Sequence, residues 1–111
     1  MNKILEQNLL YDFYGELLTD RQKDVFEQHI LDDLSLKEIA DETGVSRQGV
    51  HDSIKRSIQT LLDYEEKLHL VEKFLAIKEE LVKMTSLVDT LEKNEKTEEM
   101  KHILDRILRE L

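Results

Sequence analysis

The sequence contains no cysteine, no proline and only three glycines among its 111 residues. Without cysteine, neither a disulfide framework nor a thiolate metal site can form. With three glycines in all, a glycine-rich phosphate-binding loop is excluded as well. Aromatic residues make up only 5% of the chain, whereas β-sheets favour aromatic and β-branched side chains. These absences predict an all-α protein with one domain, or with one small domain and a helical extension.

Long apolar segments are missing too. No stretch approaches the roughly 20 apolar residues of a membrane span, and the N-terminus lacks the apolar run of a signal peptide. We therefore expect a soluble, cytoplasmic protein.

Residues arranged for catalysis or metal binding are also absent. The four histidines lie 18 or more residues apart, so no HExxH-like metal spacing exists. The serines are explained by helix capping and packing, and the carboxylate pairs by solvated helix faces. We expect no catalytic residues, no metal and no cofactor, and hence no enzyme.

An excess of basic residues, typical of nucleic-acid-binding domains, is missing as well. The net charge is −9. Residues 1–62 contain 7 basic and 12 acidic residues, and residues 63–111 contain 9 and 13. Because affinity for nucleic acid comes mainly from neutralising phosphates, tight autonomous binding to DNA is disfavoured, although a local basic patch could still bind.

Residues 36–55 nevertheless have the pattern of a helix-turn-helix. Ser35 is placed to cap the first helix and Ser46 to cap the second. Gly44 lies where the first helix must end with a positive φ. An ordinary αα-hairpin could share part of this pattern. The residues expected to face the core of the motif are Ile39, Ala40, Val45, Val50 and Ile54.

Two further helices are predicted before the motif. Apolar residues at three- and four-residue intervals predict a helix over residues 3–18, with Tyr11 and Tyr14 at the edge of its apolar face. Thr19 and Gln22 form a capping box that starts a helix ending near Leu31. The expected trihelical core consists of Leu18, Phe26, Ile30, Leu34, Ile39, Val45, Val50 and Ile54.

The apolar stripe continues beyond the motif to Leu91. It predicts either one helix of about 40 residues or two helices with a bend near residues 63–66. Thr97 is expected to cap a last helix that folds back as an antiparallel hairpin. We therefore expect a helix-turn-helix domain at 1–62 and a helical extension at 63–111. Its stripe exceeds what the core can cover, which indicates a homodimer through the extension.

The second helix of the motif has an outward face opposite Val50 and Ile54. Arg47 and Gln48 suit guanine and adenine edges, respectively, near a helix N-terminus that can meet phosphates. Asp52 would repel phosphates unless it pairs with a cytosine amino group or a protein donor. The candidate binding residues are Ser46, Arg47, Gln48, His51, Asp52, Lys55, Arg56 and Gln59. They indicate a binding module but leave its partner open.

Four segments of the chain carry a resemblance to a known family. They are Leu18-Thr19 with Gln22, LDDLSL at 31–36 with EIA at 38–40, VSRQ at 45–48 with Val50 and Asp52, and YEEKLHL at 64–70. Together these segments resemble the YlxM family of Gram-positive bacteria and mycoplasmas. The helix-turn-helix itself is similar to region 4 of bacterial sigma factors. The resemblance covers roughly residues 8–76 and leaves the C-terminal third without a recognised motif.

The resemblance implies a small helical protein linked to the signal recognition particle. In that family the gene typically neighbours the one for the particle's GTPase, and an accessory or regulatory role is proposed, with the particle's RNA or GTPase as partner. Gly49 departs from the expected small helix former and loosens the second helix by up to about 1 kcal/mol. Our leading hypothesis is a non-enzymatic accessory or regulatory protein of this pathway. The alternative is a dimeric DNA-binding transcriptional regulator.

Overall fold

The computed structural model describes residues 3–111, and all regular elements within them are helices, which confirms the all-α prediction. The chain divides into two compact units, Met1–Val71 and Glu72–Leu111, which are described separately below. In chain order the elements are α1 (Lys3–Tyr14), the 3-10 turn η1 (Gly15–Leu17), α2 (Asp20–Phe26), the π-helical turn η2 (Glu27–Leu31), α3 (Leu36–Thr43), α4 (Arg47–Leu68), α5 (Leu70–Val88) and α6 (Glu95–Glu110).

The helix-turn-helix consists of α3 and the first half of α4, and its termini confirm the predicted caps. The Ser35 hydroxyl accepts a hydrogen bond from the Glu38 amide at 3.0 Å. Gly44 ends α3 in the left-handed conformation with φ 75°. The Ser46 hydroxyl accepts from the Gly49 amide at 3.0 Å and so caps α4. Each cap satisfies a backbone N–H that would otherwise lack a partner at a helix start.

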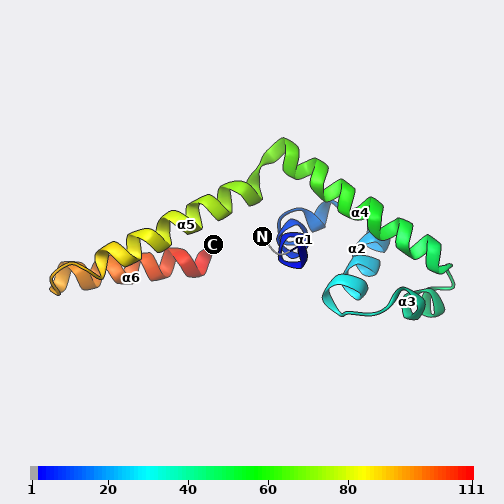
Figure 1. Cartoon of the computed structure of the whole chain (residues 1–111), viewed down its shortest axis with the longest axis horizontal. Helices are drawn as coiled ribbons and strands as arrows, with labels where there is room; N and C mark the ends of the chain where they lie inside the picture. Colours follow the sequence, from blue (N-terminus) through cyan, green and yellow to red (C-terminus); the bar gives the residue numbers. More distant parts are fainter. Residues whose placement is uncertain (1–2) are drawn as a thin grey trace. The chain divides into compact units, whose positions relative to one another are not determined.

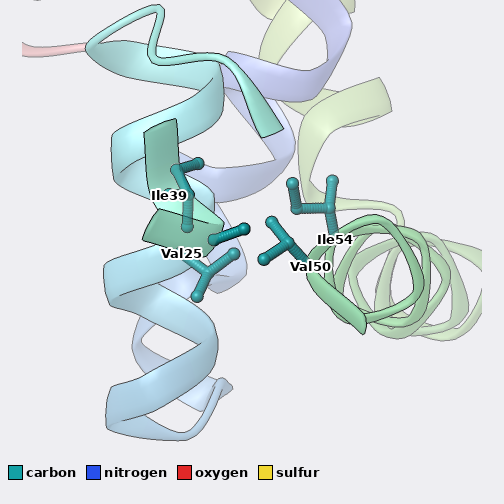
Figure 2. Packing of buried hydrophobic residues seen from close by; sticks show 5 residues of the cluster. Val25, Ile39, Val50 and Ile54 are labelled. Atoms are coloured by element: carbon teal, nitrogen blue, oxygen red, sulfur yellow. The ribbon is translucent and has the colours of Figure 1, made fainter. Parts of the chain in front are cut away.

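Within the first unit, α4 packs against α1, α2 and α3 (Figure 1). Figure 2 shows Val25 of α2 and Ile39 of α3 pointing toward Val50 and Ile54 of α4. All four side chains are buried, and Ala40 belongs to the same cluster. The spacing of Val50 and Ile54 places them on one side of α4, and this fixes which side of the helix faces outward.

The predicted core is only partly correct. Leu18 and Phe26 are buried as expected, whereas Ile30, Leu34 and Val45 are half-buried at its margin. The prediction also omitted a second set of buried residues, which lies where α1 packs against α4. We call this set the lower core; it contains Leu10, Tyr14 and Leu61. These residues are buried because α1 packs against the second half of α4, a pairing between segments about fifty residues apart in the sequence.

Tyr14 lies inside this lower core, with 1% of its surface exposed, so its predicted position at the edge was wrong. Its hydroxyl donates to Glu65 Oε1 at 2.6 Å and accepts from the Leu70 amide at 3.1 Å. The Val71 amide donates to the same Glu65 oxygen at 2.9 Å. Burial, followed by the hydrogen bond to Glu65, raises the pKa of Tyr14. This network satisfies two of the first N–H groups of α5.

The long helix breaks at His69 and not near residues 63–66. His69 adopts the left-handed conformation with φ 55°, between the end of α4 and the start of α5. Residues 63–66 continue α4 because an acidic run is compatible with a helix. The hydrogen bonds that Tyr14 and Glu65 accept from the Leu70 and Val71 amides instead stabilise the restart at Leu70. The expected boundary after Leu62 therefore falls inside α4, and the first unit extends to Val71.

The first helix is also shorter than predicted. Residues 3–18 form α1 only as far as Tyr14, and η1 then tightens the chain before Leu18, whose amide donates to the Gly15 carbonyl at 3.0 Å. A Cβ on Gly15 would lie 2.9 Å from the ring of Tyr11. That ring stacks on Phe26 with centroids 4.6 Å apart. The glycine therefore permits the close approach of an aromatic side chain.

The second unit is an antiparallel hairpin in which α6 returns alongside α5 (Figure 1). Val88 and Leu104 are buried in it, and Lys101 Nζ pairs with Asp89 Oδ1 at 3.3 Å. Asn94, not Thr97, caps α6. Its side chain accepts from the Thr97 amide at 3.0 Å, and the Thr97 hydroxyl accepts from the Asn94 amide at 2.8 Å. Thr97 is thus the third residue of the capping box, because the stronger capping residue precedes it.

Gly49 has a packing role that the sequence does not reveal. A Cβ at this position would lie 2.8 Å from Val45 Cγ1, which is shorter than an ordinary contact. Val45 packs against the core cluster and is β-branched, so it has few alternative rotamers. The glycine lets Val45 cover the start of α4.

This contact predicts coupling between two substitutions. Gly49→Ala should stabilise the wild type by less than the roughly 1 kcal/mol that helix propensity supplies, because the new methyl group must displace Val45. In a Val45→Ala background the same substitution should give the full gain. Urea unfolding of the four proteins measures the coupling. Equal gains in the two backgrounds would contradict the steric explanation.

The Tyr14 network predicts a second result. Tyr14→Phe should reduce the free energy of unfolding by about 1–3 kcal/mol, because the Glu65 carboxylate and the Leu70 amide lose a partly buried partner. Tyr11→Phe is the matched control, since its hydroxyl donates to Glu27 Oε1 at 2.6 Å on the exposed surface. We expect it to cost less than about 1 kcal/mol. Equal losses in the two variants, measured by urea unfolding, would show that the buried network has no special role.

Candidate nucleic-acid interface

All eight predicted binding residues are exposed, seven of them on α4 and Ser46 at its N-cap. This arrangement follows from the core, because Val50 and Ile54 point inward from the same turns. Four of the eight come together around a shallow hollow of about 380 Å³. They are Asp52, Lys55, Arg56 and Gln59.

The other four predicted residues lie outside this hollow. His51 lines a separate hollow of about 440 Å³ together with Lys55 and His29. The latter imidazole is already engaged, with Nδ1 at 2.8 Å from the Leu34 carbonyl oxygen. The remaining three, Ser46, Arg47 and Gln48, lie at the start of α4 and line neither hollow.

Asp52 is engaged by neighbours on its own helix. Gln48 Nε2 donates to Asp52 Oδ1 at 2.9 Å, and His51 Nδ1 lies 3.6 Å from the same oxygen. The carboxylate therefore has the protein donor that would moderate its repulsion of phosphates. A bidentate contact of Gln48 with adenine needs both ends of its amide, so forming one must first break this hydrogen bond.

The basic residues of this face are unpaired. Among residues 3–111, the side chains of Arg47, Lys55 and Arg56 form no ion pair or hydrogen bond, whereas Lys23 pairs with Glu16 at 3.0 Å. Residues 47–59 contain three basic residues and one acidic residue, in a chain of net charge −9. The first half of α4 is thus a local positive patch on an acidic protein.

The structure adds Arg21 of α2 to this neighbourhood. It lines a hollow that Arg56 also lines, on the side of α4 that faces α2. Arg21 could not be recognised as a binding residue from the sequence, because it lies 35 positions before Arg56. It also lies in the first turn of α2, where the sequence pattern is already explained by the Thr19–Gln22 capping box.

A family model described as "Putative helix-turn-helix protein, YlxM / p13 like" (UPF0122) matches residues 1–105. The chain belongs to this family. The resemblance found in the motifs is confirmed, and it extends well beyond residues 8–76. The UPF0122 match includes α5 and most of α6, so the helical extension is part of what the family shares. The description names a helix-turn-helix protein and no enzyme.

Related UPF0122 proteins align over nearly their whole length. One from Desulforamulus reducens is 47% identical over 111 residues, covering 97% of this chain and 95% of the relative. Another, from Bacillus pumilus, is 46% identical over 107 residues, covering 96% and 97%. A third, from Thermoanaerobacter sp. strain X514, is 42% identical over 107 residues, covering 96% and 92%. No helix of the described UPF0122 chain combines the length and apolarity needed to cross a bilayer.

Proposed function

We propose that this protein is a non-enzymatic accessory or regulatory protein of the bacterial signal recognition particle pathway. It binds nucleic acid through the exposed face of α4, with the particle's RNA, its GTPase or both as partners in the cytoplasm. The observation that carries the binding proposal is the unpaired state of Arg47, Lys55 and Arg56 on that face.

Charge supports a ribonucleoprotein partner over autonomous DNA binding. Only the first half of α4 is locally basic, while the chain as a whole has a net charge of −9. A few phosphate contacts then act against repulsion from the rest of the chain, so affinity for nucleic acid alone should be modest and sensitive to salt. An acidic protein can gain additional affinity from a basic protein surface. The specific link to the particle rests on the family resemblance.

The alternative is a dimeric DNA-binding transcriptional regulator. A helix-turn-helix places its second helix in the major groove, and Arg47 and Gln48 lie at the end of α4 that would enter it. Two observations favour the signal recognition particle proposal over this DNA-binding alternative. They are the Gln48–Asp52 hydrogen bond and the single basic patch.

A titration separates the two proposals. The purified protein is titrated at near-physiological salt against the particle's RNA, the particle's GTPase and a random duplex DNA. We expect saturable binding to the RNA or to the GTPase and weaker binding to the duplex. Specific binding to a duplex, with no response to either particle component, would refute the pathway assignment.

Two substitutions test the binding face. Arg47→Ala and Lys55→Ala should each weaken binding about threefold to tenfold, because each removes an unpaired cation from the contact. The thermal unfolding midpoint should stay within a few degrees of the wild type, since neither side chain has a partner to lose. Arg106→Ala, an exposed arginine on α6, is the charge-matched control. Normal binding by both α4 variants, together with lost binding by the α6 variant, would place the site elsewhere.

We also propose that the second unit is the oligomerisation element of a homodimer. Its hairpin leaves many large apolar side chains exposed, among them Leu87 at 63% and Val82 at 51%. An apolar groove of about 400 Å³ lies between α5 and α6, next to Ile77, Met84 and Leu104. Such apolar surface is stabilised by burial against a second helical hairpin.

Sedimentation velocity tests the dimer. The wild type should sediment as a dimer at micromolar concentration, and Leu87→Gln should shift it toward monomer because the interface loses a large apolar side chain. Ser86→Gln, at a neighbouring exposed polar position, is the control. A wild-type monomer at micromolar concentration would contradict the proposal.

A further inference from the structure

A cleft between α2 and α4 lies beside the proposed binding face. Its outer part has a volume of about 390 Å³. Two arginines, Arg21 and Arg56, line it together with the hydroxyl-bearing residues Thr19 and Ser53. Val45 and Gly49 line it as well. We call this the Arg21–Arg56 cleft.

The cleft continues inward into a smaller hollow of about 140 Å³. The inner hollow reaches Val25 and Val50 of the core. The residues that line both spaces are Arg21, Val45, Gly49 and Ser53. This space stays open at Gly49, because glycine has no side chain to fill it. A Cβ at this position would lie against Val45. The cleft is thus a hollow with an apolar inner wall and a polar, basic outer part.

The outer part is built for an anion. No carboxylate lines it, and Asp24 lines only the inner hollow. Neither guanidinium is paired with any other residue of the part of the chain that the structure describes. Within the same described part, the Ser53 hydroxyl has no hydrogen-bond partner, and the Thr19 hydroxyl accepts from Gln22 at 3.2 Å but keeps its own proton to donate. Two guanidinium groups and two hydroxyl donors match the oxygens of a phosphate group.

We propose that the Arg21–Arg56 cleft binds a phosphate group of the nucleic-acid backbone. Arg56 lines both this cleft and the shallow hollow on the exposed face of α4, so the two surfaces are continuous. A strand lying on that face can therefore place one of its phosphates between α2 and α4. This contact fixes the register of the bound nucleic acid and carries no sequence information. The inference rests on the proposed nucleic-acid binding and extends the interface from α4 to α2.

The first test measures the salt dependence of RNA binding. Arg21→Gln should lower the affinity about threefold to tenfold for every RNA sequence tested and reduce the salt slope by about 1, as the loss of one phosphate contact requires. Arg106→Gln makes the same charge change on α6, in the second unit, and should leave both quantities unchanged. If Arg47→Ala weakens binding while Arg21→Gln binds like the wild type, the cleft proposal is overturned and the α4 face stands.

The second test needs no macromolecule. Inorganic pyrophosphate is added at constant ionic strength to the ¹⁵N-labelled full chain. It should shift the amide signals of Gly49 and Ser53 saturably, and Arg21→Gln should abolish the shifts. Absence of saturable shifts up to about 10 mM, above the range of weak millimolar sites, would refute an anion site even if RNA binds elsewhere. Pyrophosphate shifts without any effect of Arg21→Gln on RNA affinity would assign the cleft to a free phosphorylated ligand and overturn the backbone proposal.

Discussion

The packing of α4 against α2 and α3 is the contact on which the rest of the first unit depends. Val50 and Ile54 pack against Val25 and Ile39, and each buried aliphatic side chain contributes about 1.5–3 kcal/mol. Because one side of a helix is held this way, the opposite side is fixed as the exposed face. The positions of Arg47, Lys55 and the other candidate residues follow from four aliphatic side chains that never contact a partner.

The sequence predicted this arrangement wherever the signals are local. Caps at Ser35 and Ser46, a left-handed residue at Gly44 and apolar spacing in α4 each involve residues a few positions apart. It failed where the deciding contact is distant. Tyr14 was placed at the edge of the core because its partner Glu65 lies 51 residues away.

Other features were missed for the same reason. The break at His69 depends on the hydrogen bond between the Leu70 amide and the Tyr14 hydroxyl of α1. Arg21 and Arg56 line the same cleft only because α2 packs against α4. By sequence alone Gly49 is only a weak helix former, and its packing role depends on the methyl group of Val45 beside it. Local chemistry was therefore sufficient for the motif, whereas the partners of its flanking segments had to come from the tertiary structure.

We propose that the exposed first half of α4 is the binding surface of this UPF0122 protein. Amide chemical-shift mapping of the full chain with the particle's RNA tests it most directly. Shifted signals should concentrate in residues 46–59 and in α2, while the signals of α5 and α6 stay largely unchanged. Shifts confined to α5 and α6, with residues 46–59 unaffected, would contradict it.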